Sequence, residues 1–213
     1  LRNLQKRSSI EVLPLVPAPQ EFHYRNRIQI QVRGNQYGFF ASRTRDLVPI
    51  QSCWIAEPAL NQAMAAYANS SAKQPQRIEL SVDSAGHVTV VEGERDPETA
   101  LFGQVNRLQN EQLKNLLIKF IQGTPDWYMD LYCGAGNLTV PLHQKFPDIP
   151  GVGIEYSSAA IRQAQKLNLY NVEWFDGDVA VRLKQLPPRR GKGLIVVDPP
   201  RVGLSAETIA QMV

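Results

Sequence analysis

Runs in which apolar and polar residues alternate fill much of the first hundred positions, and this alternation predicts β-strands. The clearest run covers 27–33, where every second residue is apolar. Turn-forming residues separate it from a returning strand at 37–40, and the proline-containing segment 47–50 fits a sheet edge. A second hairpin is expected from 78–82 and 87–91. This half of the chain should therefore form an antiparallel sheet.

A helix is predicted over 58–68, because a proline stands in its first turn and apolar residues recur along one side. Those residues are Leu60, Ala63, Met64 and Tyr67. The polar segment 92–100 is rich in turn formers, so we place a domain boundary there. The expected units are a small α+β domain over residues 1–97 and a second domain over residues 98–213.

After this boundary the periodicity becomes helical, and strands and helices then alternate. One helical face collects the apolar residues Leu113, Leu116, Leu117, Phe120 and Ile121. Four strands are expected at 127–132, 151–155, 172–175 and 193–198, with helices at 137–146, 158–168 and 179–186 between them. Such alternation is typical of a parallel, doubly wound sheet. The expected fold class is therefore α/β, with a Rossmann-like sheet preceded by antiparallel hairpins.

Composition narrows the class of protein. With 213 residues, 43% of them hydrophobic, the chain can bury a core, which excludes a wholly disordered protein. No apolar run approaches the roughly 18 residues that span a bilayer, and no signal peptide opens the chain, so we expect neither a membrane protein nor a secreted one. Two cysteines cannot form a disulfide framework, which favours the cytoplasm.

The net charge of +3 is too small to indicate nucleic acid, but its distribution is uneven. Residues 1–50 contain eight Lys or Arg against three Asp or Glu, and seven of the eight are arginine. Arginine suits phosphate forks and base stacking. A solvated sheet face explains the same excess equally well, so charge alone leaves both interpretations open.

Both ends of the chain suggest a piece of a longer protein. The first residue is leucine rather than methionine, and the last segment starts as a helix capped by Ser205 but contains no stop signal. We therefore expect that residues needed for function lie outside the chain.

The main chemical signal is a strand that runs into two closely spaced glycines and then a helix. Gly134 and Gly136 allow a tight turn and leave room for a ligand at the carboxyl end of the first parallel strand. The third glycine of a dinucleotide motif is replaced by Thr139, so close approach of a pyrophosphate is not provided for. A plain structural turn remains the alternative.

Carboxylates follow the next three strands. Glu155 stands where an acidic residue meets ribose hydroxyls, and Asp178 stands where a carboxylate accepts a hydrogen bond from an adenine amino group. Asp198 opens an Asp-Pro-Pro-Arg loop, where it would meet the ligand or a target base. Each residue alone is equally explained as a solvated, capping or turn residue. Together they describe a nucleoside site without a phosphate clamp, and S-adenosylmethionine is such a ligand.

The residue after the two prolines of that loop bears on the reaction. Enzymes that methylate exocyclic amines carry an aromatic residue there, which stacks the base, whereas this chain has Arg201. This difference argues against amino-group methylation.

These features resemble the RNA 5-methyluridine methyltransferases, which act on uracil in tRNA and 23S ribosomal RNA. The matching segments are 22–27, 46–53, 102–106, 130–137 and 198–203, and the specific ones contain Gln-Val-Asn and Asp-Pro-Pro-Arg-Val-Gly. The resemblance covers nearly the whole chain from about residue 10 and lies nearest the 23S enzymes. It implies cofactor contacts, around the turn of Gly134 and Gly136, from Gln104, Tyr132, Asn137, Glu155, Asp178 and Asp198.

The resemblance also implies a mechanism in which a cysteine thiolate adds to C6 of uracil, C5 accepts the methyl group, and a carboxylate removes the C5 proton. In the family both catalytic groups follow the Asp-Pro-Pro-Arg motif, so we assign no catalytic residue within 1–213. Cys133 lies in the cofactor turn and is expected to be a packed residue. We expect the chain to bind the cofactor without turning over.

Some members of this family hold a [4Fe–4S] cluster, and Cys53 lies in the context of one ligand. A cluster needs four thiolates, so Cys53 is expected to be an orphaned ligand, with a buried cysteine as the alternative. The family's N-terminal RNA-binding barrel has no counterpart here. The implied partner is RNA, 23S rRNA rather than tRNA, and the expected state is a monomer.

Three other functions remain open. One is a different methyltransferase, acting on RNA cytosine C5 or on a small molecule. Another is a binding module that keeps the fold without the chemistry. A nicotinamide-dependent dehydrogenase is disfavoured by Thr139.

Overall fold

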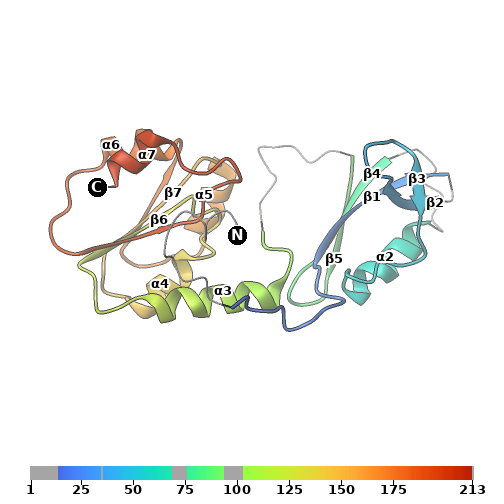
Figure 1. Cartoon of the computed structure of the whole chain (residues 1–213), viewed down its shortest axis with the longest axis horizontal. Coiled ribbons are helices and arrows are strands. Elements are labelled where there is room, and N and C mark those ends of the chain that lie inside the picture. The colour runs from blue at the N-terminus through green and yellow to red at the C-terminus, as the bar shows by residue number, and fades with distance from the viewer. Residues whose placement is uncertain (1–13, 35, 69–75, 94–102, 213) are drawn as a thin grey trace.

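A computed structural model of the chain describes residues 14–34, 36–68, 76–93 and 103–212. It contains two sheets, one antiparallel and one parallel, which lie apart along the longest axis of the molecule (Figure 1). The predicted boundary at 97/98 lies outside the described residues, and the division into two domains stays a prediction.

The antiparallel sheet has the strand order β3-β2-β1-β4-β5, with β3 at an edge as predicted. Its strands are β1 (Arg27–Arg33), β2 (Gln36–Phe40), β3 (Leu47–Pro49), β4 (Gln76–Val82) and β5 (Val88–Glu92). Helix α2 (Pro58–Ala68) covers one face, where Ile30, Leu60, Met64 and Ile78 are fully buried. The period-two and helical patterns therefore predicted this layer correctly.

The opposite face of this sheet is polar, and we call it the polar face. It carries the β1 and β4 residues that alternate with the core positions, among them Gln29, Gln31, Arg33, Arg77 and Glu79. Gln29 links its neighbours, since its Nε2 donates to Glu79 Oε2 at 2.9 Å and its Oε1 accepts from Arg77 Nη2 at 2.6 Å. The side chains of the polar face are therefore hydrogen-bonded to one another and do not form a second apolar core.

The second sheet is parallel throughout and has the order β8-β7-β6-β9. Its strands are β6 (Trp127–Leu131), β7 (Gly151–Glu155), β8 (Val172–Asp176) and β9 (Gly193–Val197). Its helices are α3 (Arg107–Phe120), α4 (Thr139–Lys145), α5 (Ser158–Gln165), α6 (Val179–Gln185) and α7 (Ala206–Gln211). This confirms the predicted Rossmann-like class. The first strand lies between the second and the fourth, so its carboxyl end is the topological switch point, where such sheets bind ligands.

Helix α3 lies where the helical periodicity predicted a helix. It begins at Arg107 and is capped by Asn106, and its apolar stripe is only partly buried, since Leu113 is 40% and Phe120 is 68% exposed. A hollow of about 380 Å³ between α3 and β9 leaves Phe120 at the surface.

Among the described residues, no helix combines the length and the apolar character needed to cross a membrane.

Candidate cofactor site at the ends of the parallel strands

The turn after β6 holds three residues at left-handed φ within five positions. These are Tyr132 at +64°, Gly134 at +56° and Gly136 at +90°. A tyrosine in this region is strained, and such strain persists only where packing enforces it. The ring of Tyr132 packs against the apolar cluster that includes Met129 and Val179. The fold therefore holds this turn in a defined shape.

The two glycines have different roles. A Cβ on Gly134 would meet nothing within 4 Å, which fits the predicted open approach for a ligand. A Cβ on Gly136 would lie 2.9 Å from Leu167 Cδ1 and 3.1 Å from Trp174 Cη2. The Trp174 ring on β8 also covers Gly153, its register partner on β7. Gly136 therefore makes room for the Trp174 indole, which was not predicted as part of the site. Gly153, a glycine within a strand, was the available sequence signal that a bulky group packs there.

Glu155 connects two of the elements around the site. Its Oε2 accepts a hydrogen bond from the Gly134 amide at 3.1 Å, and its Oε1 accepts one from the Ser157 amide at 3.0 Å. It thus fixes the β6 turn to the start of α5. Each carboxylate oxygen keeps a further lone pair, so the group can still accept hydrogen bonds from two ligand hydroxyls.

Asp130 is a second carboxylate of the site, and it was not among the site residues predicted from the sequence. It is 1% exposed on β6, and its Oδ2 accepts a hydrogen bond from Thr139 Oγ1 at 2.6 Å. Its buried Oδ1 has no hydrogen-bond partner among the described residues. The pKa of Asp130 is raised to about 7: burial is the main cause, the nearby Asp198 and Glu155 charges add to it, and the hydrogen bonds from Thr139 oppose it. The available sequence signal for a role of Asp130 was its position as a carboxylate inside an otherwise apolar strand.

Asp178 lies just after the end of β8 and Asp198 just after the end of β9, as predicted, and both residues are exposed. Asp178 caps α6, since its Oδ1 accepts from the Val181 amide at 3.1 Å. The Asp198 amide donates to Leu131 O at 3.4 Å, which places it beside the end of β6. The structure therefore brings Glu155, Asp178 and Asp198 to the same edge of the sheet as the glycine turn.

The two predicted amide residues differ in what they contact. The backbone carbonyl of Gln104 accepts from Asn26 Nδ2 at 3.2 Å. The side chain of Asn137 pairs with that of Asn110 on α3, with each Nδ2 donating to the other Oδ1 at 2.8 and 2.9 Å. Asn110 was not among the residues predicted from the sequence.

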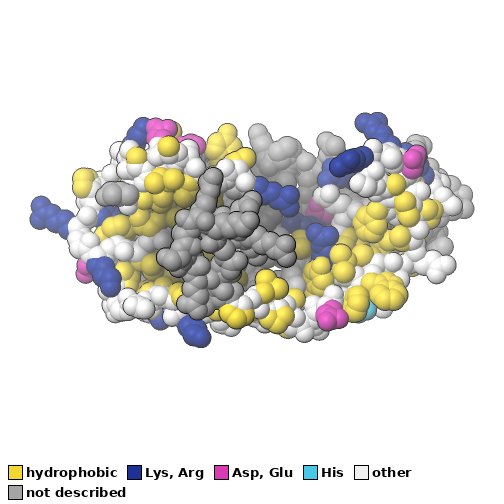
Figure 2. Space-filling view, viewed as in Figure 1, with side chains coloured by type: hydrophobic (Ala, Val, Ile, Leu, Met, Phe, Trp, Pro, Cys, Tyr) yellow, Lys and Arg dark blue, Asp and Glu magenta, His cyan; other side chains and the backbone are white. Residues whose placement is uncertain are grey.

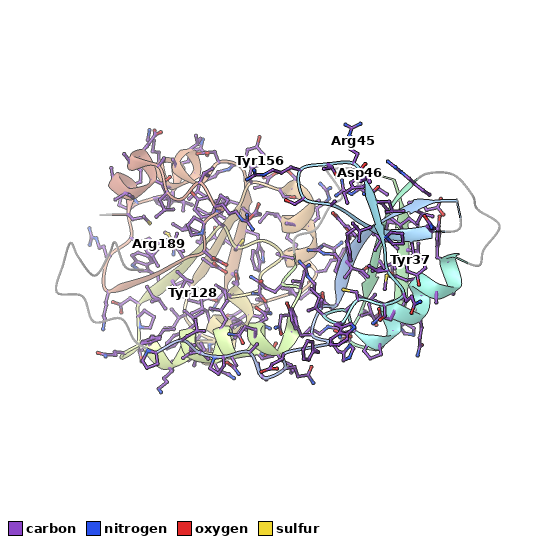
Figure 3. All side chains as sticks on the ribbon, turned by 45° about the vertical axis from the view of Figure 1, so that its right-hand side comes forward. Tyr37, Arg45, Asp46, Tyr128, Tyr156 and Arg189 are labelled. Atoms are coloured by element: carbon purple, nitrogen blue, oxygen red, sulfur yellow. The ribbon has the colours of Figure 1, made fainter. Side chains whose placement is uncertain are left out.

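Tyr156 adds an exposed aromatic surface directly after Glu155. Its side chain is 76% exposed. Figure 3 shows it on the side of the parallel sheet nearest the antiparallel sheet, with Tyr128 farther away. A flat ring at a strand end is able to stack on a purine.

Neither cysteine is placed to act as a nucleophile. The Cys133 thiol is buried and lies 3.6 Å from Gly134 O as a donor. Burial, together with the Asp130 and Glu155 charges, raises the pKa of this thiol far above its ordinary value, so it stays protonated. Cys53 is 9% exposed within the apolar core of the antiparallel layer.

A [4Fe–4S] cluster does not fit the residues of this chain alone. It needs four thiolates, and the sequence contains two cysteines, which lie in different cores. The described segments also hold no group of three or more His, Cys, Asp or Glu side chains that could bind a metal. Cys53 as a cluster ligand stays a prediction.

No family model matches the chain, but curated proteins are similar to it in sequence. An uncharacterised RNA methyltransferase of Bdellovibrio bacteriovorus is 32% identical over 203 residues, which are 92% of this chain and 51% of the relative. The 23S rRNA (uracil(1939)-C(5))-methyltransferase RlmD of Haemophilus influenzae is 25% identical over 242 residues, covering 84% of this chain and 55% of the relative.

The crystal structure of the Pyrococcus abyssi tRNA (uracil-54, C5)-methyltransferase, in complex with S-adenosyl-L-homocysteine, has the same fold. It superposes with a TM-score of 0.75 at 17% identity, covering 99% of this chain and 68% of that one.

The described sheets and helices thus have the fold of this S-adenosyl-L-homocysteine-bound methyltransferase. The homologues of this chain are RNA methyltransferases and include uracil-5 enzymes, as the sequence motifs predicted. The chain spans about half the length of the curated relatives it matches.

Proposed function

We propose that this chain is the cofactor-binding part, and part of the RNA-binding surface, of an S-adenosylmethionine-dependent enzyme that methylates C5 of uracil in RNA. One observation carries the proposal: Glu155 joins the glycine turn to α5 at the switch point of the parallel sheet, among further strand-end carboxylates. The homologues with RNA methyltransferase names support it.

The chemistry of the site suits this cofactor. Glu155 would accept hydrogen bonds from the two ribose hydroxyls, Asp178 would receive the adenine amino group, and Tyr156 would cover the ring. The cofactor supplies a methyl group on a positively charged sulfur. Asp130 and Asp198 would stabilise that positive charge, since they lie close enough together for the Asp198 charge to raise the pKa of Asp130. Thr139 occupies the place where a dinucleotide site would need a glycine.

RNA would lie between the two sheets. The antiparallel sheet carries exposed arginines that could contact RNA phosphates: Arg33 Cζ lies 5.6 Å from the centroid of the Phe40 ring, and the loop between β2 and β3 carries Arg43 and Arg45. Figure 2 shows Lys and Arg side chains gathered at the hollow between the two halves of the molecule. Cations beside an exposed aromatic ring suit single-stranded RNA. We propose 23S rRNA as the substrate, which also implies a cytoplasmic protein.

Addition to C6 of uracil requires an accessible thiolate, whereas Cys53 is buried and Cys133 is both buried and held protonated. The chain's own residues would therefore bind and orient the cofactor and the RNA without completing the reaction. We expect binding but no methyl transfer from the 213-residue chain.

Two experiments test this function. S-adenosylhomocysteine should bind to the chain saturably, whereas NAD⁺ should not; binding of NAD⁺ alone would overturn the cofactor assignment. The full-length natural protein should release tritium from RNA that carries 5-tritiated uridine. Methylation with the tritium retained would overturn the uracil C5 assignment.

A further inference from the structure

We infer that Asn110 is a positioning residue for the cofactor turn, and that it couples this turn to the antiparallel sheet through α3. The inference rests on the proposed function, because it concerns the same cofactor site.

The first step is the pairing itself. Asn110 and Asn137 exchange two side-chain hydrogen bonds of 2.8 and 2.9 Å, and both residues are partly buried. Such a reciprocal pair fixes the orientation of both amides, since a flip of either one would oppose two donors or two acceptors. Asn137 keeps one N–H and one oxygen lone pair for a ligand. Their directions are therefore set by Asn110.

The second step is what holds Asn110. The first turn of α3 is tied to the antiparallel layer by its start: the Asn26 amide donates to Val105 O at 2.9 Å, and Arg25 bridges Asn106. Arg107 forms an ion pair with Glu57 at 3.3 Å and donates to the carbonyl of Val82 at the end of β4. No residue of α3 is fully buried, so polar contacts rather than core packing set the position of this end of the helix.

The consequence is a cofactor turn held from two sides. Glu155 holds the Gly134 amide from β7, and Asn110 holds Asn137 from α3. Only the second contact leads back to the antiparallel sheet, on which RNA is proposed to bind. A cofactor that needs Asn137 correctly oriented would therefore bind best when α3 is seated on that sheet.

The test compares Asn110→Ala with Asn115→Ala, an exposed position on the same helix. The dissociation constant of S-adenosylhomocysteine should rise about tenfold for Asn110→Ala, which corresponds to two hydrogen bonds of modest net value, and stay unchanged for Asn115→Ala. Asn110→Asp keeps the size and the acceptor atoms but not the donor, and should fall between wild type and Asn110→Ala. Asn110→Asp also keeps the inference testable if Asn110→Ala fails to fold.

Two readouts separate positioning from general destabilisation. The double variant Asn110→Ala/Asn137→Ala should bind no more weakly than Asn137→Ala, because the residues act as a unit. Amide hydrogen exchange of residues 134–138 should accelerate in Asn110→Ala, while exchange along β6 stays protected.

The outcomes distinguish the two proposals. Wild type that does not bind S-adenosylhomocysteine contradicts the proposed function. Wild type that binds, with Asn110→Ala and Asn110→Asp binding equally well or with additive effects in the double variant, overturns the role of Asn110.

Discussion

Asp130 and Thr139 form a buried pair that carries an energetic cost. A carboxylate at 1% exposure loses its hydration, and one hydroxyl and one amide from Thr139 replace only part of it. The unpartnered Oδ1 is the natural place for a proton. In the free protein the pair is therefore more stable when it is neutral, and a cation bound nearby would favour the ionised form.

The pH dependence of stability follows from this. The pKa of Asp130 is raised from 3.8 to about 7 in the folded state, so the folded state binds the proton more tightly than the unfolded state. The contribution of Asp130 to the free energy of unfolding is fully present below pH 4. It is lost as the pH rises through 7, which lowers the free energy of unfolding by roughly 2–4 kcal/mol. Asp130→Asn should remove this loss.

The measurement is urea denaturation at pH 5 and pH 8, with the exposed Asp148→Asn as a control. The difference between wild type and Asp130→Asn isolates this group, because the other titrating groups are shared. Equal pH dependence in the two proteins would contradict the buried, protonated Asp130.

Gly136 gives a packing prediction with a matched control. Gly136→Ala would place a Cβ against Leu167 and Trp174 at φ +90°, whereas Gly86 has φ +88° with nothing within 4 Å. Backbone strain of about 1 kcal/mol should appear in both alanine variants, and overlap should add roughly 1–3 kcal/mol at Gly136 alone. Equal losses in the free energy of unfolding would show that Trp174 does not press on the turn.

Among the elements, those with a regular apolar period were predictable from sequence. β1 was predictable because every second residue is apolar, and these residues are the buried ones. α2 was predictable because the apolar residues Leu60 and Met64 share one side, and both are buried. The start of α3 was missed because it depends on Asn106 and on polar contacts with distant residues. The Asn110–Asn137 pair joins positions 27 apart in sequence, and no local pattern encodes it.

The β2–β3 loop allows a test of RNA binding at the level of one element. Arg43 and Arg45 are exposed there, and Figure 3 shows Arg45 projecting outward. Arg43→Ala/Arg45→Ala should lower affinity for single-stranded RNA roughly tenfold at low salt. The slope of log K against log salt should fall by about 1.4, or 0.7 for each lost phosphate contact.

Arg162→Ala/Lys166→Ala, on α5 and at its C-cap, removes the same charge elsewhere and should have little effect. The same loss in both double variants would indicate general attraction of RNA to a basic protein and would contradict a specific path over this loop.

At the scale of the whole molecule, the site depends on how two sheets meet. The positions of three carboxylates were predictable, because Glu155, Asp178 and Asp198 each lie at or just after the end of a recognisable strand. Their support was not predictable, because Trp174, Asn110 and Asp130 act through packing and burial that only the folded chain shows. The antiparallel layer contacts α3 through the Arg107–Glu57 ion pair, so we expect it to contribute to the proposed cofactor site as well as to the proposed RNA surface.

Calorimetric titration with S-adenosylhomocysteine, comparing wild type with Glu155→Ala, tests the central claim most directly. Asp148→Asn is the control, because Asp148 is an exposed carboxylate just before β7, at the opposite end of the strand from Glu155. We predict saturable binding by wild type and by Asp148→Asn, and at least about 30-fold weaker binding by a folded Glu155→Ala. Absence of binding by wild type, or equal affinity in all three proteins, would contradict a nucleoside cofactor site at these strand ends.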